Sequence, residues 1–412
     1  MTKIKVGVIG GAGYTAGELL RILVNHPNVE VVFVNSSSNA GNPLTDVHSG
    51  LVGETDMVFT SELPLNEVEA LFLCSAHGDS KKFVESNEIP VGVKIVDLST
   101  DYREKRTDHD FLYGLPELNR DEIKNANRIA NPGCFATAIQ LGLLPLASAG
   151  LLTDEVHINA ITGSTGAGVK PSSTSHFSWR NNNISVYKAF EHQHLQEIGQ
   201  SLEQLQPGFD KDLNFIPVRG NFARGIFVTS YINCSLSLDQ AKTLYQQYYK
   251  DAAFTFMVSK NPDMKQVVNT NKAIVYLEKH GDKLLIISMI DNLLKGASGQ
   301  AVQNFKTDIV TGRKSGIEFE INRILTMFLV NKRNYKKWTK WRQRKILFCL
   351  LTGFVYGFVT ILFNIIYRLI FNPVAIVETS IAISFGSFIG GCFFILAVWF
   401  ENERRFKDLS GN

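Results

Sequence analysis

The sequence has few cysteines and no close pair of them. Its 412 residues include five cysteines at long spacings, and no C-x-x-C occurs. This spacing argues against a disulfide framework and a zinc site, so we expect no metal, and it favours a reducing compartment. The net charge of +3 is too small to indicate a nucleic-acid-binding protein. The first residues run directly into a strand pattern, so we expect no secretory signal peptide.

The first third of the chain alternates short apolar strands with helical patterns. Residues 15–25 have helical spacing through their leucines. The strand patterns cover residues 3–9, 29–34, 70–74 and 94–98. This alternation is typical of a parallel, doubly wound sheet. We therefore predict an α/β fold that begins with a Rossmann-type domain over residues 1–133.

After Cys134 the pattern changes to one helix followed by longer strands. The helical pattern covers residues 135–148. The strand patterns lie at 156–161, 226–234, 273–278 and 283–289. Strands that follow one another without intervening helices predict an antiparallel sheet covered on one face. We expect a mixed-sheet α+β domain over residues 134–295 and a return helix to the first domain at about 296–310.

A glycine-rich turn joins the first strand to the first helix. Gly11, Gly13 and Ala16 fit the G-x-G-x-x-A form of the dinucleotide fingerprint. Such glycines let the backbone approach a pyrophosphate, and the helix N-terminus stabilises its charge. We predict cofactor contacts from Gly10, Gly11, Gly13, Tyr14, Thr15 and Ala16.

The second strand ends without the acidic residue that NAD sites use to hold the ribose 2′-hydroxyl. Residues 35–39 are N-S-S-S-N, whose hydroxyls and amides can accept a 2′-phosphate without repulsion. We therefore predict NADP(H) as the cofactor, with Ser36 and Ser38 beside that phosphate. The same residue types are also common in polar loops.

The last hundred residues differ in character from the rest. Residues 331–345, at the end of a predicted basic linker over 311–345, hold eight basic residues and no acid. Residues 346–367 and 379–400 are uncharged, apolar stretches of membrane-spanning length. Pro373 marks a turn between them, and the basic flanks predict that both ends face the cytoplasm. We predict a transmembrane helical hairpin over 346–400 that anchors a cytoplasmic catalytic region to the inner membrane; the alternative is a buried helical pair.

The turn Asn131-Pro132-Gly133-Cys134 leads straight into a helical pattern. A thiol at a helix N-terminus has its thiolate stabilised by the helix dipole and by free N–H groups. Those N–H groups can also hold an oxyanion. Cys74 and Cys234, by contrast, lie within apolar strand patterns, where a structural cysteine is the expected role. We therefore predict that Cys134 is a catalytic nucleophile.

Several segments resemble the acyl-phosphate reductases, and in particular the N-acetyl-gamma-glutamyl-phosphate reductase family. They follow the glycine-rich turn in the expected order over residues 4–304. These segments are VDLSTDYR (96–103), YGLPELNR (113–120), NPGCFAT (131–137), GSTGAGVKPS (163–172), EHQHLQEIGQ (191–200), FARGIF (222–227) and DNLLKGASGQAVQN (291–304).

The resemblance implies an oxidoreductase of arginine biosynthesis. In this reaction NADPH reduces N-acetyl-glutamyl 5-phosphate, a small anionic acyl phosphate, to the 5-semialdehyde through a thioester on Cys134. It also implies that residues 134–295 carry both catalysis and dimerisation, so we expect a homo-oligomer. A succinyl or carrier-linked acyl group is equally compatible with the residues.

The resemblance also implies roles for other side chains. His192 and His194 lie in the segment that matches the family's H-R-H-x-P-E-I motif, and we expect one of them to transfer protons. The alternative is that they only position the substrate. Many family members carry a further histidine where this chain has Val218. Arginine suits carboxylate and phosphate. The expected substrate-binding residues are Ser99, Arg103, Asn131, Arg219 and Arg224. The expected contacts near the nicotinamide are Ser164, Gly166 and Asn304.

Two other functions fit part of the sequence. An enzyme like aspartate-semialdehyde dehydrogenase would use the same cysteine on a shorter acyl phosphate. A membrane-tethered NADP-binding module without catalysis would keep the glycine-rich turn but would not need Cys134. From Phe305 onward the sequence no longer resembles the family.

Overall fold

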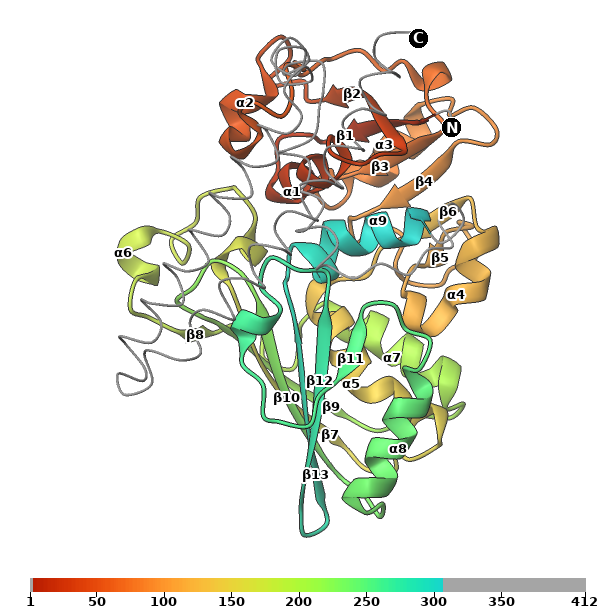
Figure 1. Ribbon diagram of the computed structural model, residues 1–412, viewed down its shortest axis with the longest axis vertical. Helices are drawn as coiled ribbons and strands as arrows, with labels where there is room; N and C mark the ends of the chain where they lie inside the picture. Colours follow the sequence, from red (N-terminus) through yellow and green to blue (C-terminus); the bar gives the residue numbers. More distant parts are fainter. Residues whose placement is uncertain (1–2, 307–412) are drawn as a thin grey trace, which may run out of the picture. The chain divides into compact units, whose positions relative to one another are not determined.

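The computed structural model describes residues 3–306. The strands of this part of the chain form two sheets (Figure 1). The strands before Cys134 in the sequence make the first sheet, and the strands after it make the second. The helices are α1 (Tyr14–Leu23), α2 (Leu44–Val47), α3 (Asp79–Ser86), α4 (Pro116–Asn125), α5 (Cys134–Ser148), α6 (Phe177–Arg180), α7 (His194–Leu205), α8 (Leu238–Tyr248) and α9 (Gly299–Lys306).

The first sheet contains the strands that precede Cys134. These are β1 (Ile4–Ile9), β2 (Val29–Asn35), β3 (Ala70–Leu73), β4 (Lys94–Asp97), β5 (Leu112–Tyr113) and β6 (Arg128–Ala130). Their order is β2-β1-β3-β4-β6-β5, and every neighbouring pair is parallel. β3 is fully buried, as expected for a strand with both faces covered. The predicted parallel Rossmann-type sheet is confirmed.

The second sheet follows α5. Its strands are β7 (Val156–Thr162), β8 (Ser185–Val186), β9 (Leu213–Arg219), β10 (Ile226–Asn233), β11 (Thr255–Met257), β12 (Ala273–His280) and β13 (Lys283–Ile290). The order is β11-β12-β13-β10-β7-β9-β8, with parallel pairs at β11–β12 and β7–β9 and antiparallel pairs elsewhere. The prediction of a mixed-sheet domain is confirmed.

One face of the second sheet is covered by α5, α7 and α8 (Figure 1). α5 is buried along nearly its whole length because its residues are almost all apolar or small. Its apolar side chains share one core with those of β7, β10, β12 and β13. The helix that carries Cys134 at its first residue is therefore held rigidly by the core of its own domain.

The chain returns to the first domain through a π-helical turn, Leu294–Ser298, and then α9. Ala301, Val302 and Phe305 of α9 join the core formed by β1, β3 and α1. A hydrogen bond from Ser298 Oγ to Thr15 O (2.7 Å) fixes the turn to the start of α1. Short π-helical segments are often found at functional sites, and this one lies against Cys134, as described below.

No helix within residues 3–306 is long and apolar enough to cross a membrane. The predicted hairpin over 346–400, the basic linker over 311–345 and the end of the predicted return helix lie outside the described residues.

Candidate active site

The turn Asn131-Pro132-Gly133-Cys134 carries the predicted nucleophile and is called the nucleophile turn below. It is fixed to the carboxyl ends of the parallel strands. Asn131 follows β6, and its N–H donates to Asp97 O at the end of β4 (2.7 Å). Its side-chain Nδ2 donates to Ala297 O in the π-helical turn (3.2 Å). Gly133 has extended backbone angles at the N-cap of α5, and no side chain caps the helix. The leading N–H groups of α5 are therefore free of any capping side chain and lie around the Cys134 thiol.

The Cys134 thiol lies in a tight, half-buried position. A Cβ atom on Gly296 of the π-helical turn would come within 2.8 Å of Cys134 Cβ, so only glycine fits there. Burial is the main cause that raises the pKa of Cys134, to about 11, and the charge of Glu197 adds to it. Arg103 and the backbone N–H groups of Cys134 and Phe135 act in the opposite direction. The thiol is thus protonated at neutral pH and requires a base.

Glu197 of α7 ties the nucleophile turn to two other groups, the Tyr113 hydroxyl and the Arg103 guanidinium. Its carboxylate accepts hydrogen bonds from Gly133 N (3.0 Å), Tyr113 OH (2.9 Å) and Arg103 Nη1 (3.3 Å). The side chain is 2% exposed. A buried carboxylate with this many donors is well satisfied and rigid. Glu197 therefore fixes the backbone immediately before Cys134.

The two predicted histidines, His192 and His194, flank the same turn. Their ring centroids are 4.5 Å apart, and the His192 ring lies 5.5 Å from the ring of Phe135, the residue after Cys134. His194 Nε2 is 3.8 Å from a Glu197 oxygen. A Cβ atom on Gly133 would lie 2.4 Å from His194 Nε2, so the absence of a side chain there lets the imidazole approach the turn.

Both imidazoles are neutral at physiological pH. Burial lowers the pKa of His192 to about 4, helped by the charges of Lys188 and Arg219. Burial also lowers the pKa of His194 well below its usual value, helped by Arg103. His192 Nδ1 accepts a hydrogen bond from His194 N (3.2 Å), so the proton of the neutral ring is on Nε2. His194 Nδ1 is buried without a hydrogen-bond partner.

Arg219, at the end of β9, stands over the ring of Tyr187. The guanidinium carbon is 4.6 Å from the ring centroid, and the Tyr187 ring is 5.8 Å from that of His192. Arg219 Nε is buried without a hydrogen-bond partner. A half-buried guanidinium whose Nε has no partner, close enough to His192 to lower its pKa, is suited to an anionic group of a ligand.

Arg103 and Ser99 follow β4 and are largely engaged within the protein. Arg103 Nε donates to Asn131 O (2.9 Å) and its Nη2 to Leu98 O (3.0 Å), in addition to its bond with Glu197. Ser99 Oγ donates to Asp97 Oδ2 (2.7 Å). These bonds place both residues at the site, where they shape the turn that carries Asn131 and Cys134.

Arg224 lies in an ion-pair network between the two domains. It donates to both oxygens of Glu18 on α1 (2.7 and 3.2 Å) and to both oxygens of Asp291 after β13 (3.0 and 3.0 Å). Asp291 is completely buried and also accepts from three backbone N–H groups. The guanidinium fork is thus occupied by carboxylates of the protein itself.

The glycine-rich turn has the shape that a dinucleotide needs. Gly10 has a φ of +75°, and a Cβ atom on Gly11 would lie 2.3 Å from Val34 Cγ1. At Gly13, however, a Cβ atom would meet nothing within 4 Å, and no side chain caps α1. An open helix N-terminus bordered by glycine fits a pyrophosphate. Tyr14 is 45% exposed, and Ala16 is buried against the core.

The polar loop after β2 forms a compact cluster. Asn39 Nδ2 donates to Ser36 Oγ (3.1 Å) and Ser38 Oγ (3.0 Å). The two hydroxyls also lie 3.5 Å apart in a hydrogen bond in which one of them donates to the other. The hydrogen of the accepting hydroxyl is therefore free to donate to an anion. The cluster fits a 2′-phosphate and contains no carboxylate that would repel one.

The residues predicted to lie near the nicotinamide are found in two places, a loop of the second domain and helix α9. Ser164 and Gly166 lie in the loop that follows β7, where Ser164 N donates to Phe222 O (2.8 Å). Asn304 of α9 is 2% exposed, and its Nδ2 donates to Gly114 O (2.7 Å) and to Asn131 Oδ1 (3.0 Å). Asn304 therefore contacts the nucleophile turn directly.

Three residues of the site were not predicted. Glu197 is the acidic residue of the segment that matches the H-R-H-x-P-E-I motif, which was a usable signal. Tyr187 lies more than fifty residues from Cys134, and no spacing in the sequence indicates its place near the site. His77 follows β3, and its Nδ1 accepts from Thr100 N (3.2 Å), while burial and then Arg103 lower its pKa. Its position after a parallel strand, at the sheet edge where ligands bind, was a usable signal. Within residues 3–306 no cluster of histidine, cysteine and acidic side chains could hold a metal ion.

Comparison with family models and with solved structures identifies the class of protein to which this chain belongs. Residues 5–126 match the model described as semialdehyde dehydrogenase, NAD binding domain, and residues 134–292 match semialdehyde dehydrogenase, dimerisation domain. Aspartate semialdehyde dehydrogenase II from Vibrio cholerae has a TM-score of 0.57 at 16% identity, covering 74% of this chain and 98% of its own. A probable aspartate-semialdehyde dehydrogenase from Pseudomonas aeruginosa has a TM-score of 0.60 at 15% identity, covering 75% and 99%. Fold and cysteine turn together define the semialdehyde dehydrogenase class.

Sequence identity to named relatives identifies the particular family within that class. Proteins named N-acetyl-gamma-glutamyl-phosphate reductase are 67% identical in Parabacteroides distasonis and 65% in Bacteroides fragilis, each over 301 residues. These matches cover 73% of this chain and 94% of each relative. The relative from Flavobacterium johnsoniae is 58% identical over 305 residues, 73% of this chain and 94% of its own. The chain belongs to the N-acetyl-gamma-glutamyl-phosphate reductase family.

Proposed function

We propose that the protein reduces N-acetyl-glutamyl 5-phosphate to N-acetyl-glutamate 5-semialdehyde with NADPH, in arginine biosynthesis. The observation that carries this proposal is Cys134 at the open N-terminus of α5, beside two neutral imidazoles. The relatives that share 58 to 67% of the sequence supply the substrate name. A thioester on Cys134 would keep the acyl carbon electrophilic towards hydride after phosphate has left, whereas the free carboxylate would not accept hydride readily.

The first step requires removal of the Cys134 proton. We assign this to His194, because its ring is neutral and its Nδ1 has no other partner. The thiolate attacks the acyl carbon, the new C–S bond replaces the C–O bond to phosphate, and phosphate leaves. The leading N–H groups of α5 would hold the oxyanion of the tetrahedral intermediate. His192 Nε2–H would donate to the substrate rather than take a proton.

The second step regenerates the thiolate. The cofactor, when bound, supplies the hydride that converts the thioester to a thiohemiacetal. Gly10, Gly11, Gly13, Tyr14, Thr15 and Ala16 would hold its pyrophosphate, and Ser36 and Ser38 its 2′-phosphate. Ser164, Gly166 and Asn304 would border the nicotinamide. Collapse of the thiohemiacetal breaks the C–S bond and releases the aldehyde, and the proton on His194 returns to the thiolate.

Substrate anions are proposed to bind through arginine. Arg219 is the best supported of the three candidates because its buried Nε has no partner within the protein. Arg103 keeps donors beyond those used by Glu197, Asn131 and Leu98, and lies beside Ser99 and Asn131. Arg224 would act indirectly, since carboxylates fill its fork.

Steady-state kinetics on two acyl phosphates and two cofactors test the proposed function. We expect kcat/KM for N-acetyl-glutamyl 5-phosphate to exceed that for aspartyl phosphate by at least 100-fold, and NADPH to be preferred over NADH. A preference for aspartyl phosphate would assign the chain to the aspartate-semialdehyde dehydrogenase type. An absence of turnover with retained NADPH binding would leave a non-catalytic NADP-binding module.

We also propose that residues 346–400 anchor the catalytic region to the cytoplasmic side of the inner membrane. The support is the sequence alone: two uncharged 22-residue stretches flanked by basic residues. Extraction of membranes with alkaline carbonate checks this. Recovery of the full chain in the membrane pellet is expected, and recovery only in the supernatant contradicts the anchor.

A further inference from the structure

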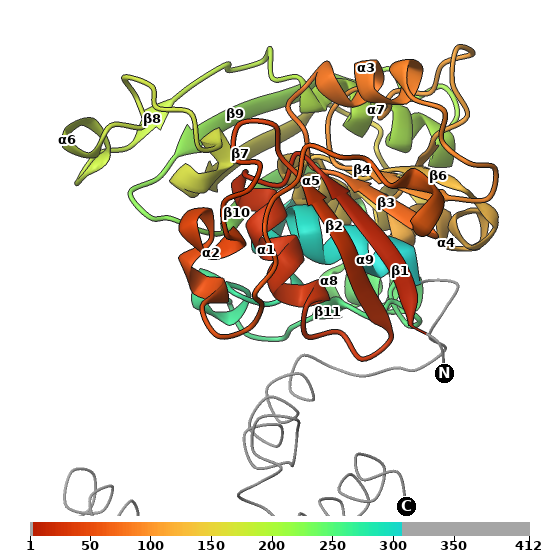
Figure 2. The same ribbon diagram turned by 90° about the horizontal axis from the view of Figure 1, so that it is seen from above.

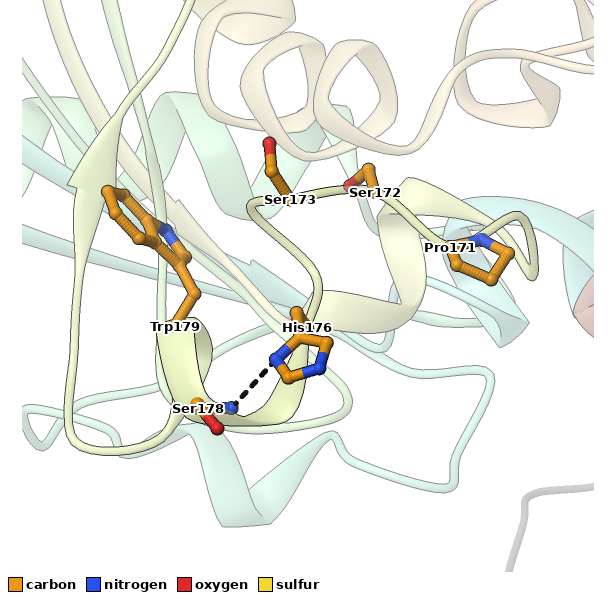
Figure 3. Close-up of a pocket in the computed structure, with 6 residues that line it drawn as sticks. All are labelled: Pro171, Ser172, Ser173, His176, Ser178 and Trp179. Carbon is orange, nitrogen blue, oxygen red and sulfur yellow. Dashed lines mark hydrogen bonds between the residues drawn. The ribbon is translucent and has the colours of Figure 1, made fainter.

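Polar contacts at an open surface and in the interior differ in how firmly they fix the chain. Figure 3 shows an open hollow in the second domain, lined by six residues between 171 and 179, where His176 Nδ1 accepts from Ser178 N (3.3 Å). All six lining residues are exposed, so water can take the place of such a contact. The π-helical turn beside Cys134 instead carries a lysine, Lys295, with no exposed surface. A buried charge of this kind needs partners from the protein itself.

Three acceptors surround the Lys295 ammonium. Its Nζ donates to Glu117 Oε1 (2.9 Å), Glu117 Oε2 (3.1 Å) and Gln303 Oε1 (3.0 Å), which uses all three of its N–H groups. The Glu117 side chain is 1% exposed and also accepts from Thr255 Oγ1 of β11 (2.8 Å). The cluster thus joins the π-helical turn to α4, α9 and β11. In both views α4 and α9 lie next to each other (Figures 1 and 2).

A buried ion pair contributes geometry more than stability. Taking two charges out of water offsets much of their attraction, so an apolar pair of similar volume is often as stable. An ammonium whose three N–H groups all have fixed acceptors, however, has only one position. The pair between Lys295 and Glu117 is therefore suited to fixing the path of the π-helical turn.

The register of the π-helical turn places a glycine against the nucleophile. Gly296 N donates to Asp291 O and Ser298 N donates to Leu293 O, both at 2.9 Å. Each bond spans five residues instead of the four of an α-helix, so the turn holds one more residue than an α-helical turn would. At this register Gly296 faces Cys134, where a Cβ atom on residue 296 would lie 2.8 Å from Cys134 Cβ.

A change to the α-helical register would bring a side chain to the place of Gly296. The shift is one residue, and both neighbours of Gly296, Lys295 and Ala297, carry a Cβ atom. That atom would meet Cys134 Cβ at a distance that real contacts do not show. The thiol would have to move away from the leading N–H groups of α5, and the new side chain would cover it.

The residues after Gly296 contact two further parts of the site. Ala297 O accepts from Asn131 Nδ2 of the nucleophile turn (3.2 Å), and Ser298 Oγ donates to Thr15 O at the start of α1 (2.7 Å). A change of register would therefore disturb these contacts together with the contact to Cys134.

We propose that Lys295 is a positioning residue, which acts through Glu117 to hold residues 294–298 in the π-helical register and so keeps glycine against Cys134. Loss of the ion pair lets the turn adopt the α-helical register and displaces the thiol. The consequence for turnover rests on the proposed function, whereas the position of the thiol does not depend on any substrate.

Alkylation of Cys134 by iodoacetamide, followed on its peptide by mass spectrometry, reports the position of the thiol without substrate or cofactor. The variant combines Lys295→Met with Glu117→Gln, so that neither charge stays buried alone. We expect at least tenfold slower alkylation than in the parent, because the thiol is covered and its thiolate has lost the helix N–H groups. Urea unfolding should stay close to that of the parent. Under the proposed function, kcat/KM for the acyl phosphate falls by at least tenfold as well.

Two single variants bracket this double variant. Tyr245→Phe is the matched control, because its buried hydroxyl donates to Gly142 O of α5 (2.6 Å) and has no part in the π-helical turn. It loosens the helix that carries Cys134 and should leave the alkylation rate unchanged. Gly296→Ala places a Cβ atom against the thiol directly and should be alkylated as slowly as the double variant.

Alkylation of the folded double variant at the rate of the parent, or faster, overturns the proposal. Equal slowing in Tyr245→Phe also overturns it, because general loosening would then explain the effect. A parent that reduces no acyl phosphate contradicts the proposed function alone, since the alkylation comparison still decides the role of Lys295.

Hydrogen exchange on the parent covers the case in which the double variant does not fold. The amides of Gly296 and Ser298 should exchange as slowly as those of β13, the strand that precedes the turn. Exchange much faster than that of β13 means that the ion pair does not hold the register, and this result overturns the proposal.

Discussion

Gly133 leaves the space through which His194 and Glu197 approach the nucleophile turn. A Cβ atom there would lie 2.4 Å from His194 Nε2 and 2.6 Å from Glu197 Oε1, closer than real contacts allow. We expect Gly133→Ala to lower kcat/KM by at least 100-fold, since displacement of either group moves the base or the turn. Gly199→Ala on α7, where a Cβ meets nothing within 4 Å, is the control and should keep full activity. Parent-like kinetics in both variants would contradict the geometry.

The proposed role of His194 as the base predicts how activity depends on pH. Because the pKa of Cys134 is about 11, a chain without its base must wait for the thiol to ionise unaided. We expect His194→Asn to lose about 10²- to 10⁴-fold in kcat/KM at pH 7 and to recover progressively as the pH rises towards that pKa. His192→Asn should lose less and keep the pH dependence of the parent. Profiles of His194→Asn that run parallel to the parent at all pH values would assign the proton to another group.

The pKa of both imidazoles is lowered on folding, which has a consequence for stability. The unfolded chain then binds more protons than the folded chain between about pH 4 and 6.5. Stability is therefore full above that range and is lost as the pH falls through it. This acid sensitivity is the cost of keeping two neutral imidazoles buried beside the turn that carries Cys134.

At the scale of secondary-structure elements, the Arg224 network joins α1 to the end of β13. Removing the guanidinium would leave the fully buried Asp291 without its charged partner, so we expect Arg224→Gln to lower the free energy of unfolding by up to about 3 kcal/mol. The KM for NADPH should also rise, because α1 begins at the glycine-rich turn. Urea unfolding and steady-state kinetics measure the two effects.

Arg21→Gln is the matched control for Arg224→Gln. Arg21 pairs with the same Glu18, but from the surface of α1 and three residues away. Arg21→Gln should lower the free energy of unfolding by no more than about 0.5 kcal/mol. If Arg224→Gln instead keeps its stability and raises only the KM of the acyl phosphate, Arg224 is a direct substrate ligand.

The elements differ in how well their sequence predicts them. The parallel strands of the first sheet and the Cys134 turn have strong local signals, namely apolar runs next to glycine. β9 was not predicted, because Pro217 interrupts a pattern that lacks alternation, yet it pairs with β7 over seven positions. The contact between Glu197 and Gly133 spans 64 residues and depends on how α7 packs on α5, which no local pattern encodes.

For the whole molecule, the sequence predicted two sheets of different type joined at Cys134, and both sheet types are confirmed. The path of residues 169–190 was not predicted, because their polar and apolar side chains follow no regular period. Arg180 within this segment donates to Arg219 O of β9, a contact that no local pattern encodes. The π-helical turn contacts both the start of α1, at Thr15, and the turn that carries Cys134, at Asn131. The proposed function depends on one covalent step at Cys134.

Mass spectrometry of the trapped acyl-enzyme tests that step most directly. The full chain is mixed with N-acetyl-glutamyl 5-phosphate without NADPH and analysed intact and after digestion. We expect a mass increase equal to the acyl group on the peptide that contains Cys134. The increase should be absent from Cys134→Ala, and addition of NADPH should discharge the adduct as the semialdehyde. Turnover without any adduct, or an adduct on another residue such as Cys74, would contradict this expectation.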